Sequence, residues 1–143
     1  MPARKNEIIT DFHKLWAKIV EELKEEESCV VVEGIKDKKI LLMIGIPPNK
    51  IICVNCSKLD HIVNKISLRF KRTYLLLDRD ARGRQKMHIL RRMLEQNRIE
   101  AIDLWEHIFY PLKIYGFKSI RKVEEMKKIA LIISENTRYC DTD

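Results

Sequence analysis

Two short apolar runs, each ending abruptly at an acidic residue, are the feature that most constrains how this chain can fold. Residues 74–77 read Tyr-Leu-Leu-Leu and are followed by Asp78 and Asp80, and residues 30–32 read Val-Val-Val and are followed by Glu33. Uninterrupted runs of this kind are typical of strands that are buried on both faces of a parallel sheet. Ligands of open α/β sheets bind beyond the carboxyl ends of such strands, so the three acids are candidates for one shared site.

Segments with helical periodicity alternate with apolar runs along the chain. The expected strands are residues 29–32, 51–54, 73–77 and 99–102, and the expected helices between them are residues 36–44, 58–67 (capped by Ser57) and 82–96. This alternation predicts a Rossmann-like, three-layer α/β/α fold with a four-stranded parallel sheet. If Glu33 is to meet Asp78 and Asp80, the first strand must adjoin the third, which gives the strand order 2-1-3-4.

The length of 143 residues suits one domain with a buried core. Within it we expect an amphipathic helix at 6–27, a core at 28–103 and a helical extension at 104–143. No apolar run approaches the roughly 20 residues of a membrane span, and the first residues lack the apolar region of a signal peptide. A cytoplasmic location, away from membranes, is therefore expected.

Positive charge is concentrated around the acidic motif. Residues 69–98 contain ten Lys/Arg and three acids, and the remaining residues balance, so this window carries the whole net charge of +7. A phosphate backbone is the partner that such a field attracts, while a solvated basic helix face is the alternative. The side chains expected to bind nucleic acid are Lys36, Arg79, Arg82, Arg84, Lys86 and Arg91.

The carboxylates suggest metal-dependent chemistry. In an extended chain, side chains i and i+2 point the same way, so Asp78 and Asp80 can converge on one cation. Hard oxygen ligands of this kind suit Mg²⁺ or Mn²⁺, and Glu33 would be either a further ligand or a general acid/base. Gly34 and Gly83 would let a phosphate or metal approach the backbone. The alternative is an Asp-rich turn that caps the next helix.

Two further motifs have competing interpretations. Asp37 follows Gly34 by three residues and is either part of the acidic motif or an acid at a helix N-terminus. Cys53 and Cys56 have CxxC spacing, but a structural zinc site needs about four ligands. The simplest interpretation of this pair is core or loop thiols, with a zinc site or a disulfide as alternatives.

Taken together, the two acidic motifs resemble the Toprim domain. Val-Val-Val-Glu33-Gly34, with Asp37 three residues on, is followed about 40 residues later by Leu-Leu-Leu-Asp78-x-Asp80-x-x-Gly83. The Toprim domain is shared by topoisomerases, primases, OLD-type nucleases and ribonuclease M5-like proteins. The resemblance covers residues 28–103 and is greatest to small, stand-alone Toprim proteins related to ribonuclease M5.

This resemblance implies a Mg²⁺-dependent nuclease or phosphotransferase acting on RNA or DNA, with Glu33, Asp78 and Asp80 as metal ligands and catalytic residues. Topoisomerases of the family carry a glutamate where Arg84 stands and take a nucleophilic tyrosine from another domain. Neither that domain nor the additional regions of a primase can be recognised here, so strand passage and primer synthesis are not expected. The alternative is a non-catalytic module that binds nucleic acid or recruits an enzyme, as a homodimer or within a larger complex.

Overall fold

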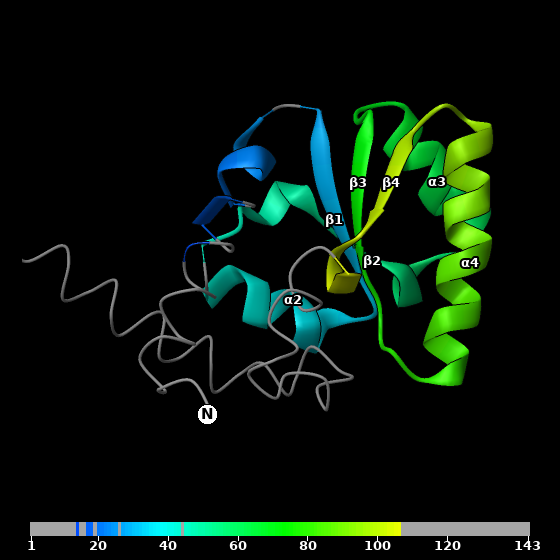
Figure 1. The fold of residues 1–143 in the computed structure, drawn as a ribbon, viewed down its shortest axis with the longest axis horizontal. Helices are drawn as coiled ribbons and strands as arrows, with labels where there is room; N and C mark the ends of the chain where they lie inside the picture. Colours follow the sequence, from blue (N-terminus) through cyan, green and yellow to red (C-terminus); the bar gives the residue numbers. More distant parts are fainter. Residues whose placement is uncertain (1–13, 15–16, 19, 26, 44, 107–143) are drawn as a thin grey trace, which may run out of the picture.

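Four parallel strands form the predicted sheet. The structure is a computed structural model and describes residues 14, 17–18, 20–25, 27–43 and 45–106. The strands are β1 (Ser28–Val32), β2 (Ile51–Cys53), β3 (Arg72–Leu76) and β4 (Glu100–Asp103). Their spatial order is β2-β1-β3-β4 with every pairing parallel, which confirms the predicted order (Figure 1).

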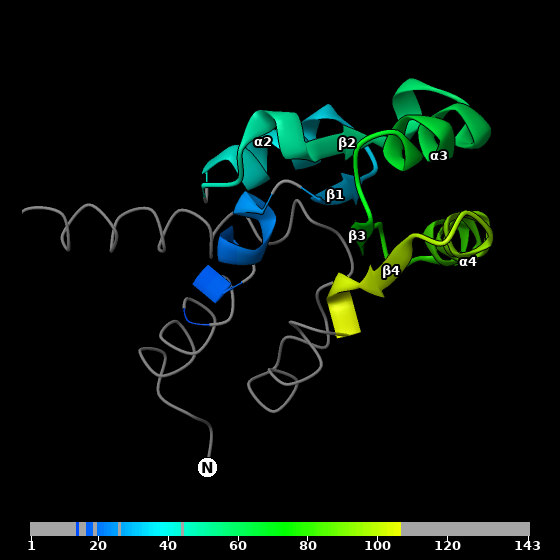
Figure 2. The same ribbon diagram turned by 90° about the horizontal axis from the view of Figure 1, so that it is seen from above.

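Helices cover both faces of this sheet. They are α2 (Ile35–Met43), α3 (Leu59–Ser67) and α4 (Ala81–Gln96), with short 3-10 helices η1 (Pro48–Lys50) and η2 (Val54–Cys56). Figure 2 shows α3 and α4 together on one face and α2 on the other, so the three-layer architecture is also confirmed. The residue before α3 is Lys58, which makes no side-chain cap bond, so the prediction that Ser57 caps this helix was wrong.

The core on the α3 and α4 side takes alternate residues of the central strands. Cys29 and Val31 of β1, and Leu75 of β3 with Leu77 just beyond it, belong to one buried cluster with the apolar faces of α3 and α4. Successive side chains of a strand point to opposite faces. Glu33, two residues beyond Val31, therefore continues the face of β1 that α4 covers.

The residues described before β1 are tied to the sheet. Residues 14, 17–18 and 20–24 are helical, Leu23 is fully buried, and the Tyr74 hydroxyl donates a hydrogen bond to the Glu22 carboxylate. Glu25 and Glu27 are not helical, so the predicted end of the helix at residue 27 was wrong. The other residues of the helix predicted at 6–27, and the extension predicted at 104–143 beyond residue 106, lie outside the described residues. No helix in the described part of the chain is long and apolar enough to cross a membrane.

A close backbone contact fixes the loop between β3 and α4. A Cβ atom added at Gly83 would lie 2.0 Å from the carbonyl oxygen of Asp78, which is far inside van der Waals contact. Gly83 is thus required because the protein's own backbone fills the space where we had expected a phosphate or metal. Gly34 is different, since an added Cβ would be 3.9 Å from its nearest neighbour, the Asn55 amide nitrogen.

These glycines make a matched pair of variants. Gly83→Ala should lower the free energy of unfolding by about 2 kcal/mol or more, because Asp78 or the first turn of α4 must move. Gly34→Ala should cost less than about 1 kcal/mol, because its Cβ meets only ordinary contacts. Urea denaturation monitored by circular dichroism measures both values. Equal unfolding midpoints for the two variants would contradict this account of the loop.

Candidate functional site

The pairing of β1 with β3 brings the two acidic motifs to one edge of the sheet. The register aligns Val32 with Leu76, so Glu33 lies beside Leu77 and Asp78 is one residue further along. The predicted adjacency of the two strands is therefore confirmed. The residue beside Glu33 is Leu77, and Asp78 is the next residue along the chain. Successive side chains of a strand point to opposite faces, so strand alternation alone does not bring the carboxylates of Glu33 and Asp78 together.

Glu33 contacts a positive charge supplied by α4. The Lys86 ammonium nitrogen lies 3.5 Å from the Glu33 Oε2 atom and donates to the Asn55 amide oxygen at 3.2 Å. The backbone N–H of Asn55 donates to the Glu33 carbonyl oxygen at 3.0 Å. The side chains of Lys86 and Glu33 are only 25% and 15% exposed, so solvent screens this pair less than a surface ion pair. Lys86, predicted to bind nucleic acid, thus compensates Glu33.

The second motif begins α4. Asp80 is the N-cap of this helix, and its Oδ1 atom accepts a hydrogen bond of 2.7 Å from the Gly83 backbone N–H. Such a bond satisfies one of the unpaired N–H groups at a helix start. Asp78 is half-buried in the preceding loop and has interaction partners within the protein. Asp80 therefore caps the helix, which was the alternative interpretation of this motif.

Asp37 and Gly34 form a similar local structure at the start of α2. The Gly34 N–H donates to the Asp37 carboxylate at 3.2 Å, and Asp37 is buried. An acid in the first turn that bonds back to the residue before the helix is one half of a capping box. This contact matches the interpretation of Asp37 as an acid at a helix N-terminus.

The predicted metal ligands Glu33, Asp78 and Asp80 have suitable chemistry, but their side chains are not gathered into one group in this structure. Among the residues that the structure describes, no three His, Cys, Asp or Glu side chains are gathered so that they could hold a metal ion. The Glu33 and Asn55 oxygens nevertheless converge on one cation, the Lys86 ammonium. Hard oxygen donors that already gather a positive charge suit Mg²⁺. A metal bound here would compete with Lys86 for the Glu33 carboxylate.

The predicted nucleic-acid contacts are in different environments. Arg82 and Arg84 are exposed on α4 and make no ion pair with another described residue. Arg79 is half-buried, with its guanidinium 5.8 Å from the centre of the Trp105 ring. Arg91 contacts Glu95 at 3.3 Å, and Lys36 is exposed near the start of α2. The most accessible positive charge of this set is therefore on Arg82 and Arg84.

A hollow beside the Asp78 loop was not predicted from the sequence. It has a volume of about 240 Å³ and is lined by polar and charged side chains from α4 and from the carboxyl edge of the sheet, together with Trp105. The α4 wall carries Arg84, His88 and Arg91, and the strand wall carries Asp78 and Asp103. A second hollow, of about 380 Å³, lies along β4 and shares Arg91, Asp103 and Glu106 with the first.

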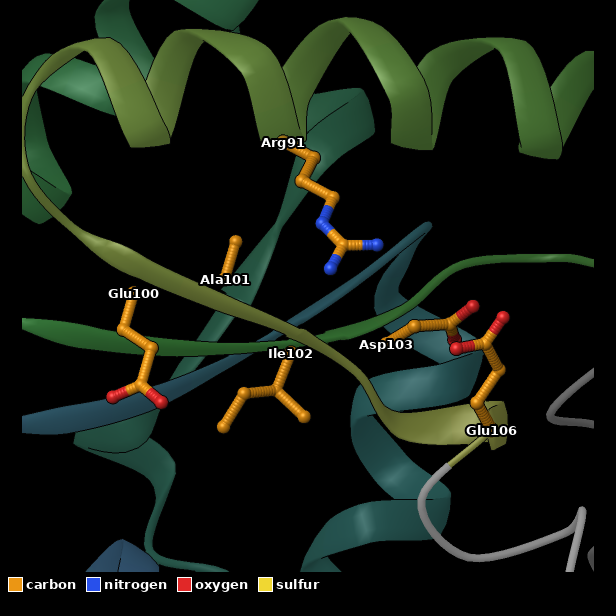
Figure 3. A pocket seen from close by; sticks show the side chains of 6 residues that line it. All are labelled: Arg91, Glu100, Ala101, Ile102, Asp103 and Glu106. Atoms are coloured by element: carbon orange, nitrogen blue, oxygen red, sulfur yellow. The ribbon is translucent and has the colours of Figure 1, made fainter.

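Figure 3 shows the end of this second hollow, where Arg91 extends from α4 toward the carboxylates of Asp103 and Glu106. Asp103 is half-buried, and its Oδ1 atom accepts a hydrogen bond of 3.0 Å from the Trp105 N–H. Burial, followed by the nearby negative charge of Glu106, raises the pKa of Asp103 above its usual value. Ionising the Asp103 carboxylate therefore costs more free energy than ionising an exposed aspartate.

Two signals in the sequence could have indicated these residues. Asp103 is an acid at the carboxyl end of a predicted strand, the same end at which Glu33 and Asp78 lie. Arg84, His88 and Arg91 follow the i, i+4, i+7 spacing of one helix face. No local pattern indicated Asn55, because its contacts with Glu33 and Lys86 exist only once β1, β2 and α4 have come together.

Comparisons with known proteins support the fold and leave the function open. No known family profile matches the chain, and neither does any curated protein. The chain is similar to a solved structure described as a putative protein from Aquifex aeolicus, with a TM-score of 0.59 and 19% identity over 87% of this chain and 99% of that one. At this identity the likeness is one of fold.

A looser likeness links the chain to a structure of the Aquifex aeolicus primase comprising its zinc-binding and RNA polymerase domains. The TM-score is 0.47 and the identity is 21%, over 78% of this chain and 27% of that one. The fold and the carboxyl edge of the sheet by themselves define an α/β protein with a four-stranded parallel sheet, in the order β2-β1-β3-β4, and acidic residues after its central strands.

The raised pKa of Asp103 gives a pH-dependent prediction. An acid whose pKa is higher in the folded than in the unfolded protein favours folding at low pH, and that contribution is lost as the pH rises through the folded value. Asp103→Asn keeps the oxygen that accepts from Trp105 but has no charge. The variant should unfold at a higher temperature than the unmodified protein at pH 7, with the difference shrinking toward acid pH. Thermal melts at several pH values test this, and a gain that does not vary with pH would contradict it.

Proposed function

We propose that this protein processes RNA or DNA in a reaction that depends on Mg²⁺ or Mn²⁺, as a nuclease or phosphotransferase of the Toprim type. The observation that carries the proposal is the position of Glu33 and of the Asp78–Asp80 pair beyond the carboxyl ends of adjacent parallel strands. In open α/β sheets this edge is where ligands bind. The exposed arginines in the first turn of α4 add a positive surface next to these acids.

In this proposal Glu33, Asp78 and Asp80 would hold the metal, which would neutralise charge that develops on a phosphodiester during transfer. Glu33 is the best candidate for a general acid/base, because its side chain projects toward α4 and is mostly shielded from solvent. Arg82 and Arg84 orient the flanking phosphates. Lys86, once it leaves Glu33, becomes a third cation available to the substrate.

The alternative, a non-catalytic module that binds nucleic acid or recruits an enzyme, has its own support. Glu33 is compensated by Lys86, and Asp80 caps α4. Clustered acids are costly only when they lack such partners. A nuclease or phosphotransferase needs the acids for cleavage. A non-catalytic module needs them only for binding or for stability.

Binding is tested first. The double variant Arg82→Gln/Arg84→Gln should weaken binding to RNA and DNA and flatten the salt dependence, by about 0.9 in the log–log slope for each phosphate of B-form DNA that the variant no longer neutralises. Lys58→Gln/Lys65→Gln, which removes two exposed charges at α3, is the matched control and should bind as the unmodified protein does. Fluorescence anisotropy at several salt concentrations measures both. Equal losses of affinity in the two double variants would show that this end of α4 is not the binding surface.

Cleavage is tested with variants that keep the fold. Asp78→Asn/Asp80→Asn should lower any cleavage rate by at least about 100-fold while nucleic-acid affinity falls much less. An Asn at position 80 can still cap α4, so stability should hold, whereas Asp80→Ala should cost about 1 kcal/mol. Asp60→Asn, at an exposed site on α3, is the control for loss of one negative charge.

The assay uses single- and double-stranded RNA and DNA with Mg²⁺, with Mn²⁺ and with chelator. Cleavage that resists chelator, or that persists at full rate in Asp78→Asn/Asp80→Asn, would contradict the catalytic proposal. Salt-dependent binding of the unmodified protein with no cleavage of any substrate would favour the recruitment module.

A further inference from the structure

Two thiols flank the turn that holds Asn55 against Glu33. Cys53 is the last residue of β2 and is half-buried, whereas Cys56 ends the 3-10 helix η2 and is exposed, and both are free thiols. Cys53 is the extended residue that precedes η2, and the two residues between it and Cys56 are helical, so a rise of about 2 Å per residue places the two Cα atoms about 6 Å apart. This separation lies within the range of about 4.4–6.8 Å that disulfides span.

We propose that Cys53 and Cys56 form a reversible redox pair, which closes to an intramolecular disulfide by exchange with the disulfide of a low-molecular-weight thiol such as glutathione. The proposal assigns a modification site at the carboxyl end of β2, next to the candidate site. It goes beyond the proposed function, because the exchange needs no metal and no nucleic acid.

The exchange proceeds in two balanced steps. The exposed Cys56 loses its proton and attacks one sulfur of the small disulfide, which forms a mixed disulfide and releases one thiolate. Cys53 then loses its proton and attacks the Cys56 sulfur, which forms the internal disulfide and releases the second thiolate. The protein is oxidised by two electrons and the small disulfide is reduced to two thiols.

The surroundings of the two thiols determine which of them reacts first. Burial raises the pKa of Cys53, and the neighbouring Cys56 raises it further, so Cys53 remains a thiol until the mixed disulfide brings an electrophilic sulfur next to it. Cys56 is the thiol that solvent and a small oxidant can reach first.

The chain contains an internal control for this reactivity. Cys29 is fully buried in β1, and its thiol donates to the Thr73 hydroxyl oxygen at 3.7 Å. Burial raises the pKa of Cys29 to about 12. A thiol that is both inaccessible and protonated does not exchange in the folded protein, so Cys29 should remain reduced under conditions that oxidise the pair.

Closure of the pair acts on the candidate site through Asn55, which lies between the two cysteines. Its backbone N–H donates to the Glu33 carbonyl oxygen at 3.0 Å, and its side-chain oxygen accepts from Lys86 at 3.2 Å. Pulling Cys53 and Cys56 to bonding distance tightens this turn and shifts both contacts. Any consequence for nucleic-acid cleavage rests on the proposed function, whereas the disulfide itself does not.

The test uses the full chain with Cys140→Ser, because Cys140 lies outside the described residues and could exchange on its own. The folded protein is equilibrated in glutathione buffers from reducing to oxidising, quenched in acid, unfolded, alkylated and digested with trypsin. Cleavage after Lys50 and Lys58 yields residues 51–58 as one peptide that holds both cysteines. We expect this peptide to become two hydrogen atoms lighter and unalkylated in oxidising buffer, and to revert with dithiothreitol. Cys29 should be alkylated throughout.

Variants and a second readout make the test decisive. Cys53→Ser should leave a persistent glutathione adduct on Cys56, and Cys56→Ser should leave Cys53 alkylated. Full alkylation of the 51–58 peptide in oxidising buffer, or a glutathione adduct that persists without closing in the presence of Cys53, would overturn the proposal.

The coupling to Glu33 is tested separately by the backbone amide resonances in ¹⁵N NMR spectra. The Asn55 amide resonance should shift on oxidation and return on reduction, while amides in the middle of α4 should not move. An unchanged Asn55 resonance in protein that mass spectrometry shows to be oxidised would overturn the coupling. Because neither readout involves nucleic acid, failure here is distinguishable from failure of the proposed function.

Discussion

The candidate site depends on the parallel pairing of β1 with β3. This pairing aligns five residues of each strand, all but one of them buried, and leaves both strands at the centre of the sheet. The acids that follow the strands then lie at the same edge. The apolar residues of both strands provide the driving force, since burying each large aliphatic side chain stabilises the fold by about 1.5–3 kcal/mol. The same burial that stabilises the fold therefore also determines where its acidic residues lie.

The concentration of negative charge at this edge is balanced by α4. Its first turn is held by Asp80 and by the close approach of Gly83 to the Asp78 carbonyl, and one turn later Lys86 reaches Glu33. Asp80 thus caps this helix, and Lys86 of the same helix is the counter-charge of Glu33. A half-buried carboxylate without such a partner would be costly. In the proposed function a metal ion would compete with the Lys86 ammonium for Glu33, so that exchange between these two cations would accompany formation of the site.

Much of this arrangement could be predicted from the sequence because it depends on local patterns. The apolar runs at 30–32 and 74–77 predict buried parallel strands, and their acidic ends predict that the strands are neighbours; the observed strand order confirms this. The limits of the four strands and of α2, α3 and α4 differ from the predictions by one residue at most, which is within the usual uncertainty of element ends. At α3 the cap was predicted at Ser57, whereas Lys58 precedes the helix without a side-chain cap bond.

Other features could not be predicted because they depend on long-range contacts. The pairing of Lys86 with Glu33 joins residues 53 positions apart, and the sequence alone suggested an outward-facing lysine. Gly83 was expected to leave room for a ligand, but the room is filled by the Asp78 carbonyl, which no motif could indicate. The hollow between Arg84 and Asp103 requires the packing of α4 on β4. The metal and the activity remain predictions.

The central claim is that the acids beyond β1 and β3 form a metal site once Lys86 is displaced. A crystal structure in the presence of saturating Mn²⁺ tests this most directly, because anomalous scattering locates the ion independently of the surrounding atoms. The account predicts an anomalous peak within coordination distance of Glu33 and of Asp78 or Asp80, with the Lys86 ammonium moved away from Glu33. Absence of a peak at this edge, with Lys86 still bound to Glu33, would contradict the account.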